Sequence, residues 1–216
     1  MSLDRRQRIE ESSSDSSLSA VIAEIELVTS EEVSYSDWYE MDEEDMPDYS
    51  GIYESFSALL EAKRYADLIH LGRFLLEKAA AQLEMDDESG SISSQISDCM
   101  EVVAKAFELS DLPVHQKVLS AIELIREDEY DLTDDIRGFI NRSHPESEWS
   151  KVADSLFGKD KEGKNTIGSS SDADLLDNAD WIEMALERSG RGDEAIAFAH
   201  RLAEKQNRDL PYISLL

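Results

Sequence analysis

The sequence predicts an all-α protein of stacked antiparallel helical hairpins, an α-solenoid with a flexible leader at its N-terminus. Two observations support this prediction. Apolar residues recur at spacings of three and four along most of the chain, as they do on one face of a helix. Two stretches, 58–77 and 185–204, also align without a gap, and such self-similarity is typical of stacked helical pairs.

Each of these two stretches reads as the end of one helix, a tight turn and the start of a second helix that folds back. The identical positions are Ala58/Ala185, Leu59/Leu186, Arg64/Arg191, Ile69/Ile196, Leu75/Leu202 and Glu77/Glu204. Neither helical pair can bury its apolar face alone, so we expect the pairs to stack.

The shared pattern is Ala-Leu, a short polar turn, an arginine and then a hydrophobic pair, and it resembles tetratricopeptide-like hairpins. The stretch 60–65, with the helix after it and the loop at 85–90, is also similar to helical regions of uncharacterised bacterial proteins. Some of those regions follow a SWIM-type zinc finger. One cysteine cannot build that finger, so neither zinc nor a nucleic-acid role is carried over. The resemblance covers about 50–130 and 173–216, and it implies an α-solenoid that binds other proteins.

The chain opens with a polar, serine-rich stretch, 1–17, which we expect to be a flexible leader. A single apolar stripe then predicts a helix over 18–28. Residues 31–50 contain nine acidic side chains and no Lys or Arg. We interpret them as an acidic linker that its aromatic residues anchor to a neighbouring helix. Two alternatives are a hard-cation site at 42–45, which lacks the pattern of a calcium loop, and a short acidic-aromatic recognition segment.

The first hairpin joins a helix over 52–60 to a helix over 65–83. Apolar residues lie on more than one side of the second helix, so we expect it to be central. Gly72 lies in the interior of that helix, where glycine costs about 1 kcal/mol relative to alanine. A close contact with a neighbouring helix would explain this glycine.

Further apolar stripes predict helices over 92–109, 114–125, 134–140 and 149–157. A loop rich in glycine, serine and acidic residues at 85–91 precedes the first of them. Pro113 suits the first turn of the second helix, and Thr133 or Asp134 can cap the third. The intervening residues 126–130 are expected to be mostly solvated surface.

Residues 158–171 contain three glycines and few apolar side chains, which predicts a mobile loop or a boundary between subunits of the solenoid. The segment 163–166 has only a superficial similarity to a phosphate loop, because no strand precedes it. The last hairpin joins helices over 175–186 and 195–203. Asp193 can cap the second of these helices, and residues 210–216 resemble the opening of one more. We expect residues 18–216 to form one helical-repeat domain.

The chain is strongly acidic, with 49 Asp and Glu against 21 Lys and Arg and a formal net charge of −28. Such a field repels nucleic acid and anionic membranes and favours basic partners. In one interpretation the acidity serves solubility alone. In the other, it attracts a basic protein, as a nucleic-acid mimic would.

Cys99 is the only cysteine, so we expect no intramolecular disulfide and no thiolate zinc site. Its place inside an apolar stripe predicts a buried structural thiol. No apolar run follows the basic residues near the N-terminus, and none approaches the ~20 residues that cross a bilayer. We therefore expect a cytoplasmic protein.

The sequence indicates a protein that is not an enzyme. The four histidines, His70, His115, His144 and His200, show no metal-ligand spacing, and no nucleophile-elbow or dinucleotide-binding glycine motif occurs. We expect no catalytic residue, metal or cofactor. A cryptic metal-dependent enzyme would need histidine and acidic side chains that converge in one pocket.

The predicted function is a protein–protein interaction module, a helical-repeat scaffold for a protein or peptide of unidentified sequence. Exposed aromatic residues are typical contact residues at such interfaces. We therefore predict Tyr53, Tyr65, Trp149 and Trp181 as partner-binding residues, on condition that they are exposed. The alternative, an acidic decoy for a nucleic-acid-binding protein, needs carboxylates spaced like phosphates on one face and binding that salt abolishes.

Overall fold

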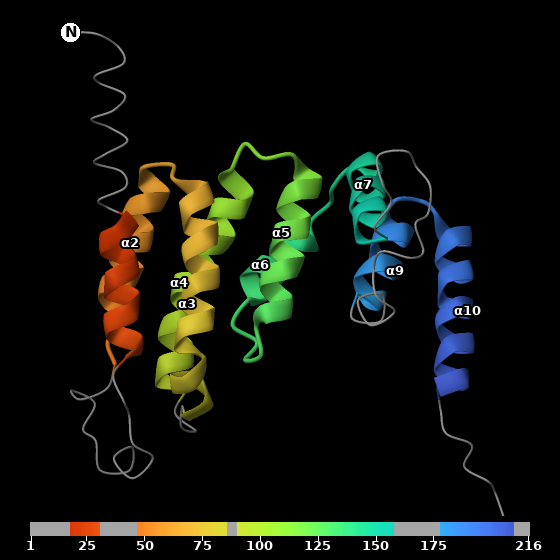
Figure 1. The fold of residues 1–216 in the computed structure, drawn as a ribbon. Coiled ribbons are helices and arrows are strands. Elements are labelled where there is room, and N and C mark those ends of the chain that lie inside the picture. The colour runs from red at the N-terminus through yellow and green to blue at the C-terminus, as the bar shows by residue number, and fades with distance from the viewer. Residues whose placement is uncertain (1–17, 31–46, 86–89, 158–177, 210–216) are drawn as a thin grey trace, which may run out of the picture. The chain divides into compact units, whose positions relative to one another are not determined.

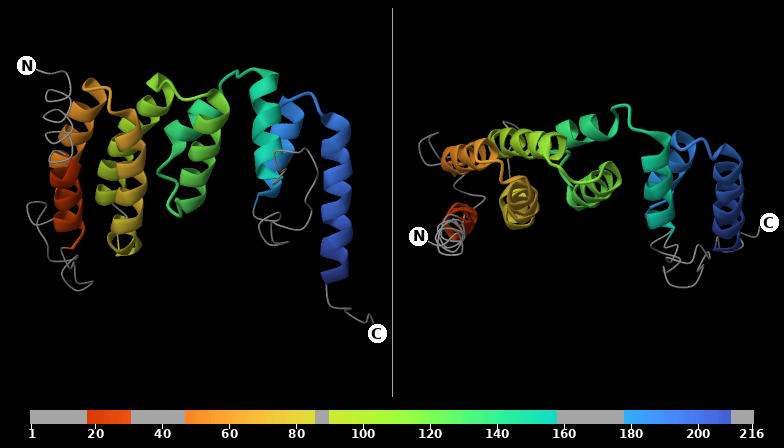
Figure 2. Two further views of the ribbon diagram at one scale, coloured as in Figure 1. Left: turned by 45° about the horizontal axis from the view of Figure 1, so that its top comes forward. Right: turned by 90° about the horizontal axis from the view of Figure 1, so that it is seen from above.

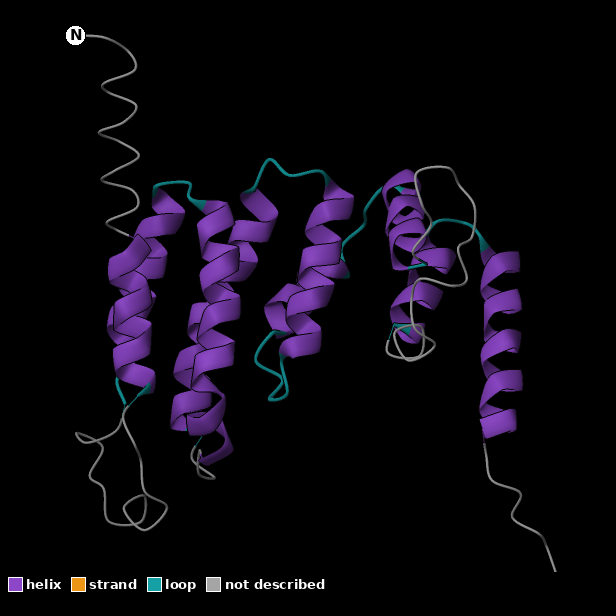
Figure 3. Cartoon of the chain, in the orientation of Figure 1, coloured by secondary structure: helices purple, strands orange, loops and turns teal. Residues whose placement is uncertain are grey.

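The computed structural model describes residues 18–30, 47–85, 90–157 and 178–209. In these ranges the chain forms helices joined by turns and loops, without a β-strand (Figures 1 and 3). The predicted all-α class is therefore confirmed. The expected leader, most of the acidic linker, the expected mobile loop and the expected helix at 210–216 lie outside the described residues.

The chain divides into two compact units. The first contains residues 1–111 and 123–141, and the second contains residues 112–122 and 142–216. One helix, α5 (Val114–Glu127), begins in the second unit and ends in the first. That residues 18–216 form one domain stays a prediction.

The first unit is built around α4. Its helices are a segment over 18–29, α2 (Ser50–Glu61), α3 (Tyr65–Met85), α4 (Ser91–Leu109) and α6 (Asp134–Ile140). Seen from above, α2, α4 and α6 form one layer, and 18–29 and α3 form a second layer (Figure 2). We expected α3 to be central, but α4 takes that place because it packs against α2, α3 and α6.

A close contact between helices explains the glycine inside α3. A Cβ atom added to Gly72 would lie 2.8 and 3.0 Å from the two methyl carbons of Val103, a fully buried residue of α4. Side chains do not approach so closely without a shift of the neighbour. The packing contact predicted for Gly72 is therefore confirmed.

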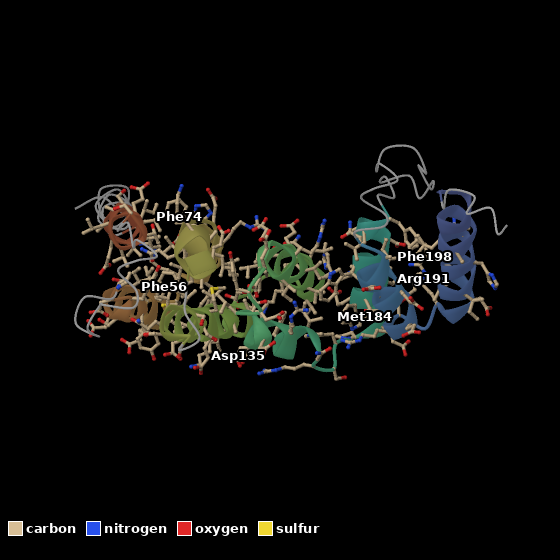
Figure 4. The ribbon with its side chains drawn as sticks, turned by 90° about the horizontal axis from the view of Figure 1, so that it is seen from below. Phe56, Phe74, Asp135, Met184, Arg191 and Phe198 are labelled. Atoms are coloured by element: carbon tan, nitrogen blue, oxygen red, sulfur yellow. The ribbon has the colours of Figure 1, made fainter. Side chains whose placement is uncertain are left out.

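The second unit contains α7 (Glu146–Leu156), α9 (Ala179–Arg188) and α10 (Gly192–Asp209), and α9 packs against both of the others. The rings of Phe157 and Phe198 meet edge to face with their centroids 5.4 Å apart. This contact joins the end of α7 to α10, and Phe198 and Arg191 lie on the same side of α10 in Figure 4. Hydrophobic burial thus holds the hairpin of α9 and α10 against α7.

The turn between α2 and α3 is a Schellman motif. The N–H of Arg64 donates to the carbonyl of Leu59, at 2.9 Å, and the N–H of Lys63 donates to that of Leu60, at 3.0 Å. Lys63 has the left-handed conformation that this motif requires, with φ 59°. A residue with a side chain occupies a position that usually belongs to glycine.

The turn between α9 and α10 has the same backbone geometry. The N–H of Arg191 donates to the carbonyl of Leu186, at 2.9 Å, and the N–H of Gly190 donates to that of Glu187, at 3.1 Å. Gly190 has φ 75° and stands where the alignment of the two hairpins places Lys63. The two stretches that align in sequence therefore share their turn.

The arginine that follows each turn also has the same role. Arg64 Nε lies 2.6 Å from Asp67 Oδ2, and Arg191 Nη2 lies 2.6 Å from Glu194 Oε2, three residues further along in both cases. Arg191 makes a second ion pair, at 2.8 Å, with Asp154 of α7. The second helix of each hairpin therefore starts with an acidic side chain held in its first turn, where the helix dipole favours negative charge.

One predicted cap is wrong. Asp193 was expected to cap the last described helix, but α10 begins at Gly192, so Asp193 lies inside its first turn. The backbone reason is that the carbonyl of Arg191 already accepts the first helical hydrogen bond, from the N–H of Ala195 at 3.1 Å. Arg191 is thus both the last residue of the turn and the residue at which the helix starts.

Candidate functional site

The four predicted contact residues differ in their exposure. Tyr53 of α2 is 42 % exposed, which satisfies the condition on which it was predicted. Tyr65 at the start of α3 and Trp181 of α9 are half-buried. Trp149 of α7 is only 2 % exposed and does not satisfy the condition. The first two belong to the first unit and the other two to the second.

The burial of Trp149 has a physical cause in the packing of the second unit. The guanidinium carbon of Arg188, at the end of α9, lies 4.9 Å from the centroid of the indole ring. The ring of His144 lies 6.0 Å from it. A cation over an indole ring is an attractive contact. Trp149 therefore stabilises the unit itself and leaves no surface on which a partner could pack.

Tyr53 lies beside a shallow hollow of about 320 Å³ between the start of α2 and the middle of α4, which we call the Tyr53 surface. Its lining residues are Tyr49, Ser50, Tyr53, Gln95, Asp98 and Glu101. Asp98 and Glu101 are exposed and three residues apart on α4, so both project on the same side. The surface thus combines an exposed aromatic ring with two carboxylates.

Tyr49 fixes the base of this surface. Its side chain is 1 % exposed, and its hydroxyl donates to the side-chain carbonyl of Gln82 on α3. Its backbone N–H donates to Oε1 of Gln95 on α4, at 3.0 Å. An aromatic residue from the end of the expected acidic linker is therefore anchored to neighbouring helices. These bonds hold the first turn of α2, and with it Tyr53, against α4.

One cation lies next to the Tyr53 surface. Lys105 Nζ is 2.7 Å from Glu101 Oε1, one helical turn away. The hydrogen bond with Glu101 raises the pKa of Lys105, and the nearby Tyr53 and Asp135 act in the same direction against the effect of burial. Lys105 partly neutralises Glu101, and Asp98 is the second carboxylate that lines the surface.

A larger hollow, about 500 Å³, lies along α3 in the same unit, and we call it the α3 groove. It is lined by Arg73, Leu76, Glu77, Ala80 and Leu83 of α3 and by Glu127, Asp128, Glu129 and Tyr130. From the sequence, residues 126–130 were expected to be mostly solvated surface. The contribution of Tyr130 to one side of the α3 groove was therefore not predicted. The one available signal was an aromatic residue placed among acidic ones directly after a helix.

The position of Tyr130 depends on Asp128. The carboxylate of Asp128 accepts hydrogen bonds from the N–H of Tyr130, at 3.1 Å, and from the N–H and hydroxyl of Thr133, at 2.9 and 2.7 Å. Thr133 is the N-cap residue of α6 as predicted, but its hydroxyl makes no capping hydrogen bond. The hydroxyl instead helps to hold the loop that presents Tyr130 to α3.

The second unit contains a compact polar cluster. Glu148 accepts hydrogen bonds from the backbone N–H of His115, at 3.1 Å, and from Lys151, at 2.5 Å, and His115 Nδ1 lies 2.8 Å from it. The bonds from Lys151 and then from His115 lower the pKa of Glu148 to about 2. The contacts between His115 and Glu148 join α5 to α7, and Lys151 pairs with Glu148 within α7, so we interpret the cluster as structural.

No cluster of three or more His, Cys, Asp or Glu side chains suitable for a metal ion is present in the part of the chain that the structure describes. Among the described helices, none is both long enough and apolar enough to span a bilayer. The comparisons with known proteins gave no relative, since no family model, curated protein or solved structure matches the chain.

Proposed function

We propose that this protein is a non-enzymatic protein-binding module, a helical-repeat scaffold that holds a partner protein or peptide on its acidic surface. The observation that supports this function best is the recurrence of one hairpin design in both units. Lys63 and Gly190 stand at equivalent left-handed positions, and Arg64 and Arg191 at equivalent positions after them. A repeated hairpin is the unit from which tetratricopeptide-like α-solenoids are built.

Repeated helical pairs present extended surfaces, and such surfaces serve to bind other proteins. The Tyr53 surface is the part that best meets the requirements of a contact site. A tyrosine offers a large, amphipathic contact area, and it is enriched among residues that dominate binding energy. Asp98 beside it favours a basic partner and disfavours an anionic one such as nucleic acid or a lipid surface. The single cysteine fits a reducing compartment, so we place this function in the cytoplasm.

The test is affinity capture of tagged full-length protein from a lysate of its own source cells, with identification of bound proteins by mass spectrometry. Three forms are compared: wild type, Tyr53→Ser and Leu109→Ser. Leu109 is a matched control because it is also an exposed apolar residue of the first unit, at 56 %, and does not line the Tyr53 surface. Each capture is washed at low and at high salt.

We expect a defined partner that wild type and Leu109→Ser retain and that Tyr53→Ser loses. Retention at high salt would indicate that apolar contact contributes, because salt screens only the charge attraction between exposed groups. A partner bound equally by all three forms would contradict the role of the Tyr53 surface. Capture of many basic nucleic-acid-binding proteins, all removed by salt, would contradict the scaffold function and favour that of an acidic decoy.

A further inference from the structure

The α3 groove has an apolar floor. Leu76 and Leu83 are 6 % and 5 % exposed, and the exposed Ala80 lies between them. The three positions follow the helical spacing of four and three, so their side chains lie in a line along α3. Arg73 and Leu83 mark the ends of the groove on α3, and ten residues of helix span about 15 Å.

The aromatic wall of the groove is Tyr130, which is 36 % exposed. Its hydroxyl donates to the backbone carbonyl of Ala80, at 3.3 Å, and this bond fixes the ring against α3. Burial, and then the charges of Glu84 and Glu129, raise the pKa of Tyr130. The ring therefore lies in a negative local potential, which is the setting in which an aromatic face best attracts a cation.

The rim of the groove is acidic. Glu77, Glu84 and Glu129 are exposed around it. The one cationic side chain that lines the groove, Arg73, is 3.0 Å from a carboxylate oxygen of Glu123 and 2.8 Å from one of Glu127. Two carboxylates therefore offset its charge. The groove thus combines an apolar floor, an aromatic wall and a net negative rim.

We propose that the α3 groove binds a basic amphipathic segment of a partner protein, with an apolar side chain on Leu76, Ala80 and Leu83 and a lysine or arginine against Tyr130. The inference rests on the proposed function, because its ligand is part of a protein partner, but it assigns a second surface. Charge complementarity selects this occupant. A second copy of the chain, with the same charge of −28, would be repelled.

The dimensions of the groove agree with this occupant. A volume of about 500 Å³ accepts a few side chains and no folded domain. A length of about 15 Å matches roughly ten residues of a helix that lies along α3. A helix with one apolar face and one basic face would place its apolar side chains on the floor and its cations toward both rims.

The test uses a fluorescein-labelled synthetic peptide of about 14 residues. Its leucines follow the helical period, and all the remaining positions are lysine. A peptide of the same composition, scrambled so that no apolar face forms, is the control for charge alone. Binding to the full chain is measured by fluorescence anisotropy. The protein is used as wild type, Ala80→Arg and Ala81→Arg.

Ala80→Arg and Ala81→Arg form a matched pair. The two alanines are neighbours on α3, both are exposed, and only Ala80 lines the groove. The substitutions add the same charge and the same bulk. A second pair, Glu129→Lys at the rim and Glu61→Lys at the end of α2, repeats the comparison should the first pair perturb the fold. Circular dichroism and urea unfolding check each form.

We expect the amphipathic peptide to bind wild type more tightly than the scrambled peptide does. Ala80→Arg should weaken its binding by about tenfold and Ala81→Arg by less than about twofold, since only the first blocks the floor. Equal effects of the two substitutions, or equal binding of the two peptides, would overturn the proposal. The peptide would then bind only through long-range attraction to the negative charge of the protein. This result would not affect the proposed function, which the loss of a partner by Tyr53→Ser tests independently.

Discussion

Glu148 is a single side chain whose ionisation contributes to the stability of the second unit. Lys151 and His115 hold its carboxylate in the ionised form and lower its pKa from 4.5 to about 2. A depressed pKa means that the unfolded chain binds the proton more readily than the folded protein does. The contribution of Glu148 to stability is therefore present above about pH 4.5 and is lost as the pH falls toward 2.

The first prediction follows from the lowered pKa of Glu148. Glu148→Gln should lower the urea midpoint at neutral pH, and the difference from wild type should shrink as the pH falls from 4.5 toward about 2. Glu146→Gln, at an exposed position of the same helix, is the control and should follow wild type. A difference that stays constant across the acidic range would contradict the assigned role of the carboxylate.

The second prediction concerns Cys99, which the sequence correctly predicted as a buried thiol. Burial, and then the charge of Asp98, raise its pKa to about 12. Because the thiolate is the reactive form, the folded protein should react with a disulfide reagent far more slowly than the chain in denaturant. Absorbance of the released thiol measures both rates, and a fast reaction of the folded protein would disprove the burial.

The third prediction uses two glycines with opposite surroundings. Gly72→Ala should destabilise the protein by about 1–3 kcal/mol, because its Cβ would collide with Val103. Gly138→Ala, where a Cβ meets no atom within 4 Å, should stabilise α6 by roughly 0.5–1 kcal/mol. Urea unfolding measures both. Stabilisation by both changes would show that helix propensity, and not the contact between α3 and α4, decides the result at Gly72.

At the scale of the helices, the hairpin turn explains why the two stretches align. Both turns need a left-handed residue followed by an arginine whose carboxylate partner lies three positions later. That requirement preserves the spacing even where the apolar residues differ. The alignment of Arg64 with Arg191 could be seen in the sequence, but the common hydrogen bonds could not, because they involve only backbone atoms.

The fourth prediction concerns substitutions at the two left-handed positions, Lys63 and Gly190. Lys63→Gly should stabilise the protein by up to about 1 kcal/mol, since glycine adopts a positive φ without steric cost. Gly190→Ala should destabilise it by about 1 kcal/mol for the same reason, as its Cβ would only touch Glu146 at an ordinary 3.8 Å. Equal effects at the two positions would show that the turns are not equivalent.

Helical periodicity predicted every described helix, because one buried face produces a regular apolar stripe. The predicted bounds lie within about four residues of the observed ones, except that α10 continues to Asp209 where we expected an end at 203. Periodicity indicated α3 as the central helix where the structure has α4, and it did not predict which residue would cover which face. Trp149 illustrates the limit: its stripe indicates an inward position, but the sequence did not show that Arg188 of α9 and His144 pack on its ring. Tyr130 lies beyond a helix end, where no period exists, and the bonds of Asp128 position it.

At the scale of the whole molecule, acidity is the property that most restricts the partner. The net charge of −28 acts at long range and disfavours nucleic acid and anionic membranes, whereas exposed aromatic rings act only locally. Tyr53 and Tyr130 both lie beside carboxylates in the first unit. We therefore expect the partner to be a basic protein with apolar contact residues.

Site-specific photo-crosslinking in the source cells asks whether another protein touches the Tyr53 surface. A benzophenone amino acid is placed at position 53 and, as control, at position 27, where the leucine is 67 % exposed in the same unit. We expect a discrete crosslinked adduct with a basic protein from position 53 and none from position 27. Adducts of equal yield from both positions, or from neither, would contradict a protein-binding module that acts through Tyr53.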